Sequence, residues 1–135
     1  MKTGNIDEIN TAAPVPLVLD QLRDHFRRTY LLNETQVETM LASSSKSLRM
    51  ALASATEIIN EKETQARFTM IFHSLKGLLL NMGELEWAEF SKELENKLKK
   101  GEQIDYAATV EIMEKGWVQI LSYGEGTVRK TALGE

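Results

Sequence analysis

The sequence FHSLKGLLLNMGELE, from Phe72 to Glu86, is the most apolar helix-forming part of this 135-residue chain. It contains one of only two histidines, His73, with Lys76 three residues later and Gly77 four residues later. A histidine in such a helix points either into the core or out to solvent, and only the outward orientation leaves its ring free to react. The periodicity of the surrounding residues indicates which orientation applies.

The larger apolar side chains of residues 64–82 gather on one side of a helical wheel with about 100° per residue. They are Phe68, Ile71, Phe72, Leu75, Leu78, Leu79 and Met82. His73 falls on the opposite side with Lys76 and Gly77, so we expect it to be exposed. The remaining neighbours within about 60° on that wheel form a predicted partner-binding face. They are Ala66, Thr69, Met70, Leu80 and Glu84. Gly83 can end the helix before Glu84 and so remove it from this face.

The rest of the chain has the pattern of an all-α protein. Its only prolines are Pro14 and Pro16, and it has neither hairpin turns nor sustained period-two alternation. Predicted helices cover residues 17–30, 34–60, 64–82, 84–100 and about 106–122. The last four are substantial and have short connections. They favour an antiparallel up-down-up-down four-helix bundle with an extra short N-terminal helix.

Local signals mark several helix ends. Asn33 has the position of an N-cap with Gln36 as its capping-box partner, and Asp105 is a second predicted N-cap. Gly83 marks the end of the helix that carries His73. The lysines at 97–100 suit the negative end of a helix dipole, and we interpret them as a solvated helix end rather than a phosphate-binding patch.

The inward stripes of the helices predict the core. The helix over 84–100 is expected to contribute Leu85, Ala88, Leu94 and Leu98. Trp87 and Trp117 are interpreted as core or rim residues. The glutamates between 84 and 95 are interpreted as a soluble face rather than a metal site, because no helical histidine accompanies them.

Composition bounds the remaining possibilities. We expect a flexible leader over 1–16, one bundle domain over 17–123 and a flexible tail over 124–135. The net charge of −4 and the pI near 5.3 make a nucleic-acid surface unfavourable. The apolar stretches are too short to span a membrane, and no signal peptide is evident. The absence of cysteine fits a reducing cytoplasm.

Four helices complete a bundle within one chain, so we expect a monomer, although the leader helix could mediate dimerisation.

An exposed imidazole suggests nucleophilic chemistry. Its pKa is ordinarily about 6.5, so at neutral pH much of it has a free lone pair that can attack phosphorus. Lys76, one turn away, can stabilise phosphoryl oxygens. Gly77 costs about 1 kcal/mol in a helix interior, which is tolerated where another molecule must come close. The alternative is that His73 is a passive surface residue and Leu80 a solitary exposed leucine.

Two motifs resemble those of a known family. HSLKG at 73–77, followed by NMG at 81–83, resembles the His-x-Leu-Lys-Gly, Asn-x-Gly signature of histidine-containing phosphotransfer (HPt) domains. ELE at 93–95 is similar to the Leu-Glu that such domains carry on the next helix. The resemblance is strongest over 68–98, and the helix pattern of 34–122 agrees with the four-helix bundle of the family.

The resemblance implies a carrier in a His–Asp phosphorelay. His73 would accept phosphoryl from a sensor histidine kinase or from the aspartate of a response-regulator receiver domain, and pass it to another aspartate. Lys76 would stabilise the phosphoryl group and Gly77 would admit the receiver, while Asn81 and Gly83 would be structural. The chain would need no cofactor of its own, because the receiver supplies Mg²⁺, and it would have no kinase activity.

One departure concerns the residues after Gly77. The family usually has small residues there, whereas this chain has leucines at 78–80. Leu78 and Leu79 face the predicted core, but Leu80 faces the docking surface. Leu80 would then add an apolar anchor that narrows partner choice, or it would hinder a standard partner; we favour the anchor.

Other functions remain as alternatives. A bundle that binds a receiver or kinase without carrying phosphate is a second class of function. A kinase dimerisation segment fits less well, because such segments resemble His-Glu followed by proline and no proline follows His73. His25 lacks a following lysine-glycine pair, so it is interpreted as structural or solvated. The chain has no nucleotide-binding loop or paired-carboxylate metal motif.

Overall fold

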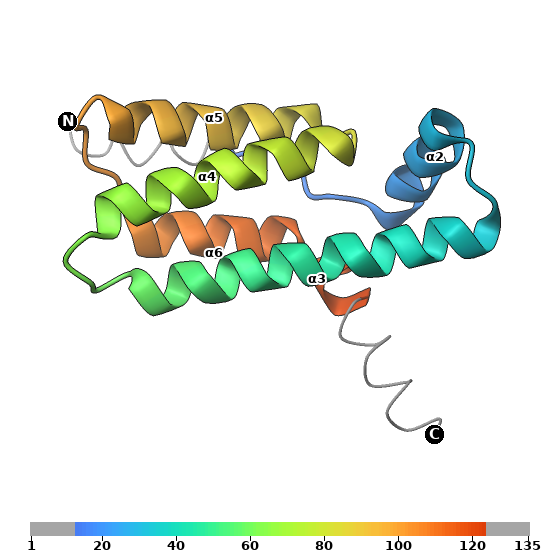
Figure 1. The fold of residues 1–135 in the computed structure, drawn as a ribbon, viewed down its shortest axis with the longest axis horizontal. Helices are drawn as coiled ribbons and strands as arrows, with labels where there is room; N and C mark the ends of the chain where they lie inside the picture. The colour runs from blue at the N-terminus through green and yellow to red at the C-terminus, as the bar shows by residue number, and fades with distance from the viewer. Residues whose placement is uncertain (1–12, 124–135) are drawn as a thin grey trace, which may run out of the picture.

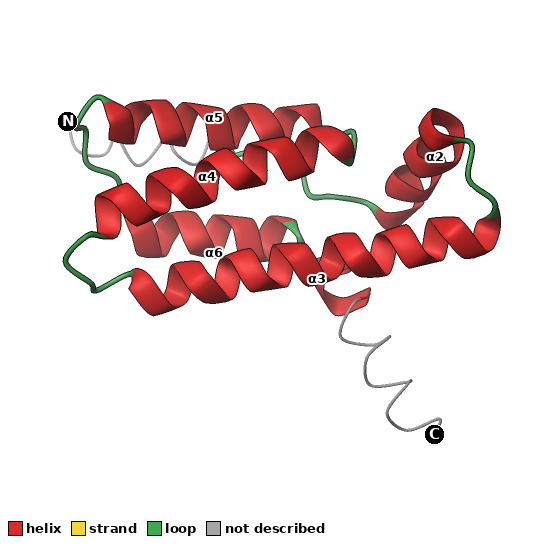
Figure 2. Ribbon diagram, in the orientation of Figure 1, coloured by secondary structure: helices red, strands yellow, loops and turns green. Residues whose placement is uncertain are grey.

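The computed structural model describes residues 13–123, and their secondary structure is entirely helical (Figure 2), as predicted. The helices are α2 (Leu19–Tyr30), α3 (Glu34–Ile58), α4 (Thr64–Asn81), α5 (Leu85–Lys99) and α6 (Tyr106–Gly116). A turn at Trp117 interrupts the last predicted helix, and residues 118–123 are again helical. The predicted tail and most of the predicted leader lie outside the described residues. Within 13–123, none of the helices combines the length and apolar character needed to cross a membrane.

The helices α3 to α6 lie lengthwise beside one another as a helical bundle (Figure 1). The chain passes from α3 to α4 at one end of the bundle, from α4 to α5 at the other, and from α5 to α6 at the first end again. α4 packs most extensively on α5, while α2, α4 and α6 all contact α3. His73 therefore belongs to the helix pair that packs most closely, α4 and α5.

The predicted helix caps are present. Asn33 Oδ1 accepts a hydrogen bond from the Gln36 backbone at 2.8 Å, and the Gln36 side chain accepts one from the Asn33 backbone at 2.9 Å. Asp105 accepts from the backbone of Ala108 at 3.0 Å. These bonds satisfy N–H groups that have no partner within the first turn of a helix. α4 ends before Gly83, whose φ of 78° turns the chain toward α5.

The core is continuous through the bundle. Its largest fully buried side chains include Phe68 and Phe72 of α4, Trp87 of α5, and Trp117. Both tryptophans are thus core residues, and their rings meet edge to face with centroids 5.5 Å apart.

The core prediction for α5 is wrong at Leu85, whose side chain is 65% exposed. The reason is the rotation of the helix. Trp87 and Phe90 occupy the inward side, and Leu85 lies two residues before Trp87, which is about 200° around the wheel. The larger aromatic side chains therefore set which face of α5 packs inward, and Leu85 is turned to solvent.

The end of the predicted leader is attached to the bundle. Residues 14–18 run without regular structure, and the Val15 carbonyl accepts a hydrogen bond from Trp87 Nε1 at 2.9 Å. The Leu17 backbone N–H donates to the Gly116 carbonyl at 2.8 Å, and its side chain is buried. This short segment thus connects the chain before α2 to α5 and to the end of α6.

Candidate functional site

His73 lies near the middle of α4 and faces outward, as the helical wheel predicts. Its side chain is 65% exposed, whereas Phe72 and Leu75 on the opposite face are buried. The apolar residues that hold α4 on the bundle therefore also fix the direction of the imidazole. The ring can meet a second molecule without any rearrangement of the helix.

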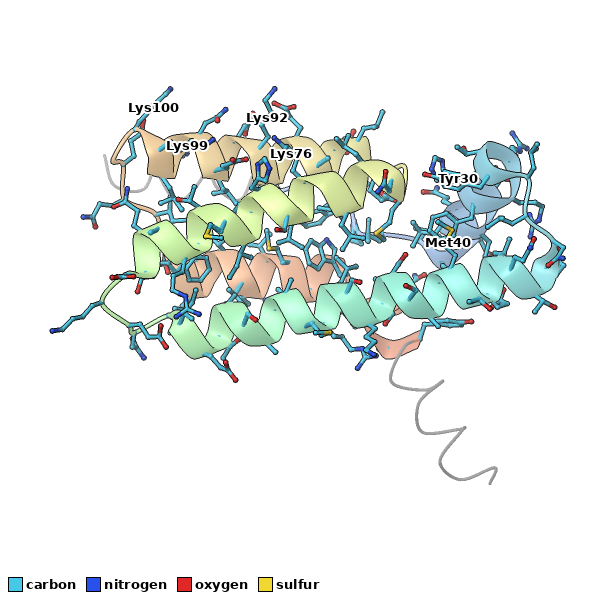
Figure 3. All side chains as sticks on the ribbon, in the orientation of Figure 1. Tyr30, Met40, Lys76, Lys92, Lys99 and Lys100 are labelled. Atoms are coloured by element: carbon cyan, nitrogen blue, oxygen red, sulfur yellow. The ribbon has the colours of Figure 1, made fainter. Side chains whose placement is uncertain are left out.

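The imidazole contacts a buried carboxylate on the neighbouring helix. His73 Nδ1 lies 3.0 Å from Oε2 of Glu95, a residue of α5 that is only 3% exposed. Lys99 Nζ lies 3.0 Å from the same oxygen, and Lys76 Nζ lies 3.6 Å from Oε1. Lys76 comes from α4 and Lys99 from α5 (Figure 3), so the packing of these two helices assembles the site.

Opposing effects set the charge of Glu95. Burial raises the pKa of its carboxyl, but hydrogen bonds from Lys99 and His73, with the charges of Lys99 and Lys76, outweigh burial and hold the pKa below its ordinary value of 4.5. Glu95 is therefore a carboxylate at neutral pH and can only accept hydrogen bonds.

The charge of Glu95 selects the tautomer of His73. An ionised carboxylate beside Nδ1 requires that this nitrogen carry a proton. In the neutral ring Nε2 then has the lone pair, and it belongs to a side chain that is 65% exposed. The arrangement presents a nucleophilic nitrogen to solvent, with the ammonium groups of Lys76 and Lys99 nearby.

Glu95 corrects the prediction that the glutamates of 84–95 form a soluble face. Glu86, Glu89 and Glu93 are exposed, but Glu95 is buried. Its position could have been inferred, because Glu95 lies within about 60° of Leu98 on the helical wheel. Only the packing of α5 on α4, however, brings it under His73. No group of three or more metal-ligating side chains forms anywhere in residues 13–123.

Gly77 is exposed one turn after His73. A Cβ built on Gly77 would meet nothing within 4 Å outside its own helix backbone. Neighbouring segments therefore give no packing reason for a glycine at a position where it costs the helix about 1 kcal/mol. The open space above Gly77 is available for another molecule to approach the imidazole.

Most of the predicted partner-binding face lies together on α4. Ala66 is exposed, Thr69 is partly exposed, and Met70 and Leu80 are 70% and 49% exposed. Glu84 is not on this face. It lies beyond the end of α4 at the N-cap of α5, because the turn at Gly83 redirects the chain. Burial, and secondarily the charge of Glu86, raise the pKa of its carboxyl.

A shallow hollow of about 600 Å³ adjoins the site along α4. It is lined by Lys62, Glu63, Gln65, Ala66, Thr69, Met70, Leu98 and Lys99. The hollow joins part of the predicted partner-binding face to Lys99. The surface around His73 therefore includes both α4 and the last turn of α5.

The other histidine has a structural position. His25 Nε2 lies 3.3 Å from the Asn81 carbonyl, and a Cβ on Gly83 would come within about 2.5 Å of the His25 ring. Tyr30 donates to the same carbonyl at 2.7 Å. His25 thus packs α2 against the turn that follows α4, which is the structural one of its two interpretations.

Comparisons of the chain with protein-family models, curated proteins and solved structures found no match. The features of this chain that bear on function are therefore the geometry around His73 and the motifs at 73–77, 81–83 and 93–95.

Proposed function

We propose that this protein is a histidine phosphotransfer protein of a two-component phosphorelay. It carries phosphoryl on His73 between a sensor kinase or receiver aspartate and another receiver aspartate. The observation that supports this most strongly is the exposed imidazole whose Nδ1 contacts the buried carboxylate of Glu95. This contact leaves Nε2 as the nucleophile, in a position that a partner can reach.

In the accepting step, Nε2 donates its lone pair to the phosphorus of an aspartyl phosphate. The N–P bond forms as the bond between phosphorus and the aspartate oxygen breaks, and the electron pair leaves on the aspartate carboxylate. Nδ1 keeps its proton, so the phosphorylated ring is positively charged. Glu95, 3.0 Å from Nδ1, stabilises that charge. In the donating step an aspartate oxygen attacks phosphorus and the N–P electron pair returns to Nε2.

Lys76 is the residue best placed to bind the phosphoryl oxygens. Its Nζ lies 3.6 Å from Glu95, beyond hydrogen-bond distance, and it stands one turn from His73 on α4. A flexible lysine can exchange this ion pair for the new anion. Lys76→Ala should raise the activation free energy of phosphoryl transfer by more than it lowers the free energy of unfolding.

The exposed face of α4 is proposed as the docking surface for the receiver. Open space above Gly77 permits in-line approach to Nε2, and Ala66, Thr69 and Met70 extend the surface toward the hollow beside Lys99. Leu80 supplies an apolar anchor at the other end. The receiver, rather than this chain, would hold the Mg²⁺ ion.

The finer arrangement of the bundle belongs to the same proposal. Connections of only a few residues between α3 and α4, α4 and α5, and α5 and α6 support an antiparallel up-down-up-down order. We further propose a cytoplasmic monomer, since the four helices bury a common core within one chain and partners of this kind act in the cytoplasm.

The test is phosphoryl transfer from a phosphorylated receiver domain in the presence of Mg²⁺, followed by intact mass and acid-lability measurements. We expect one acid-labile, alkali-stable phosphate on the wild type and none on His73→Gln. His25→Gln, which makes the same change at the other histidine, should still be labelled. Full labelling of folded His73→Gln would show that the assignment of the site is wrong.

A non-phosphorylated scaffold is the second candidate, and the exposed Met70 and Leu80 favour it as sites of apolar contact. The same experiment separates the two. Calorimetric binding to receivers or kinases, without labelling by any of them, would support the scaffold and exclude the carrier. In that case Leu80→Ala should weaken the binding.

A further inference from the structure

The second lysine at Glu95 has no role in the mechanism above. Lys99 Nζ and His73 Nδ1 each lie 3.0 Å from the same carboxylate oxygen, Oε2, whereas Lys76 lies nearer to Oε1. A carboxylate oxygen has two lone pairs, so it can accept both bonds at once. The last turn of α5 is therefore linked to the imidazole through one atom of Glu95.

A buried carboxylate needs a cation to remain charged. Glu95 is 3% exposed, and burial alone would favour its protonated form. The charged or titratable groups that face it are His73 and Lys76 from α4 and Lys99 from its own helix. When Lys76 moves to a phosphoryl group, Lys99 is the lysine that stays on Glu95.

We propose that Lys99 is a positioning residue for phosphoryl transfer: it holds Glu95 ionised, so that Glu95 keeps the proton of His73 on Nδ1 while Lys76 is free to bind phosphoryl. The two lysines thus have separate tasks, since Lys76 contacts the transferred group and Lys99 acts through Glu95. This inference rests on the proposed function of His73 as the phosphoryl carrier.

The exposure of Lys99 allows its role to be tested by substitution. Lys99 is 58% exposed, so Lys99→Met can be made without opening a cavity in the core. Lys97, on the same helix turn, is exposed and has no ion pair among the contacts of the described residues. Lys97→Met is therefore a matched control that removes the same charge without touching Glu95.

The first measurement needs no partner protein. Nitrogen NMR of the imidazole reports which ring nitrogen carries the proton. We expect the Nδ1–H form of His73 in the wild type, in Lys97→Met and in Lys99→Arg. In Lys99→Met we expect the neutral ring to be a mixture of the Nδ1–H and Nε2–H tautomers. Identical tautomer populations in the spectra of Lys99→Met and Lys97→Met would overturn the proposal.

The second measurement is the rate of transfer from a phosphorylated receiver as a function of pH. Lys99→Met should slow transfer about tenfold, within the coupling range of contacting residues, and move the acid limb of the profile to higher pH. The cause is that Glu95 takes up a proton more readily without Lys99, and protonated Glu95 no longer holds the Nδ1 proton. Lys99→Arg, which keeps the positive charge, should have the same rate and pH profile as the wild type.

A double-mutant cycle separates action through Glu95 from direct action on phosphoryl. Glu95→Gln has no charge to maintain, so adding Lys99→Met to it should change the rate less than twofold or so. An undiminished tenfold loss in that background would mean that Lys99 contacts the phosphoryl group or the partner directly, and would contradict the positioning role.

The failures of the two proposals are distinguishable. If His73 is never labelled but its tautomer changes in Lys99→Met, the carrier function fails while the coupling of Lys99 to His73 stands. If wild-type transfer is observed and Lys99→Met matches Lys97→Met in both rate and tautomer, the carrier function stands and the role of Lys99 fails.

Discussion

Glu95 links a buried charge to the reactivity of an exposed ring. Its carboxylate makes contacts with His73, Lys76 and Lys99, and each contact uses a group from α4 or α5. The ion pairs offset the burial of the charge, so the pKa of the carboxyl is lowered rather than raised. At the scale of single residues, stability and the proposed function therefore involve the same carboxylate.

The lowered pKa makes stability depend on pH with a definite sign. The interactions of ionised Glu95 stabilise the fold fully above its ordinary pKa of 4.5 and are lost as pH falls through the lower pKa of the folded state. The advantage of the wild type over Glu95→Gln in free energy of unfolding should therefore shrink as pH is lowered from neutral into this acid range. Urea denaturation at several pH values measures it, and a difference that does not vary with pH would contradict the linkage.

Gly77 is predicted to favour function over stability. Gly77→Ala should raise the free energy of unfolding by about 1 kcal/mol, because alanine is the better helix former and its Cβ meets no neighbouring segment. Transfer from a receiver should nevertheless become slower, because the methyl group occupies the space beside His73. Denaturation and transfer assays on one variant test both effects. Unchanged transfer would indicate that the partner approaches elsewhere.

At the scale of elements, the two helix ends at Gly83 and Gly101 provide a comparison. Both glycines have positive φ, 78° and 81°, but a Cβ on Gly83 would strike the His25 ring while one on Gly101 meets nothing. The first therefore carries two constraints, a backbone conformation and a contact between α2 and the turn after α4. The second carries only the backbone conformation.

These constraints can be measured separately. Gly101→Ala should destabilise the protein by about 1–2 kcal/mol through its backbone conformation alone. Gly83→Ala should cost about 1–3 kcal/mol more, because the His25 ring must move. When Gly83→Ala is made in the His25→Ala variant, its further cost relative to His25→Ala should fall close to the cost of Gly101→Ala. Thermal or urea unfolding would show this. Equal losses for the two single glycine variants would mean that the His25 contact is unimportant.

At the scale of the whole molecule, Trp87 joins parts of the chain that are far apart in sequence. Its indole N–H donates to the Val15 carbonyl, its ring packs on Trp117, and a Cβ on Gly116 would overlap the ring. The segment before α2, the start of α5 and the end of α6 thus meet around one side chain. The end of the bundle remote from the α5–α6 connection depends on this packing.

Gly116→Ala is therefore expected to have the opposite effect on stability from Gly77→Ala. Both glycines are helical, so alanine improves helix propensity at each. At Gly116 the gain is outweighed by overpacking against Trp87, which should give a net loss of about 1–3 kcal/mol. Unfolding followed by tryptophan fluorescence measures both variants. A stabilised Gly116→Ala would show that Trp87 moves at little cost.

Local interactions explain which features could be predicted from the sequence. Helix positions, the Asn33 capping box and the outward direction of His73 depend on residues within one or two turns of each other, and periodicity and cap chemistry record them directly. For His25 the sequence leaves a structural and a solvated position open, because it shows only that no lysine-glycine pair follows this histidine. The motif at 73–77 likewise points to His73 as the proposed phosphoryl carrier without knowledge of any contact.

The rotation and register of each helix against its neighbours required the tertiary structure. Glu95 belongs to a predicted soluble face as well as to the motif at 93–95, and Leu85 is a predicted core residue, because the sequence does not state which side of α5 meets α4. Packing of the large rings of Trp87 and Phe90 turns Leu85 outward, and the same rotation places Glu95 beneath His73. Local chemistry thus specifies the helices and the exposed histidine. The carboxylate that selects the tautomer of this histidine reaches it only when α4 and α5 pack, because His73 and Glu95 are 22 positions apart in the chain and periodicity records only neighbours within one or two turns.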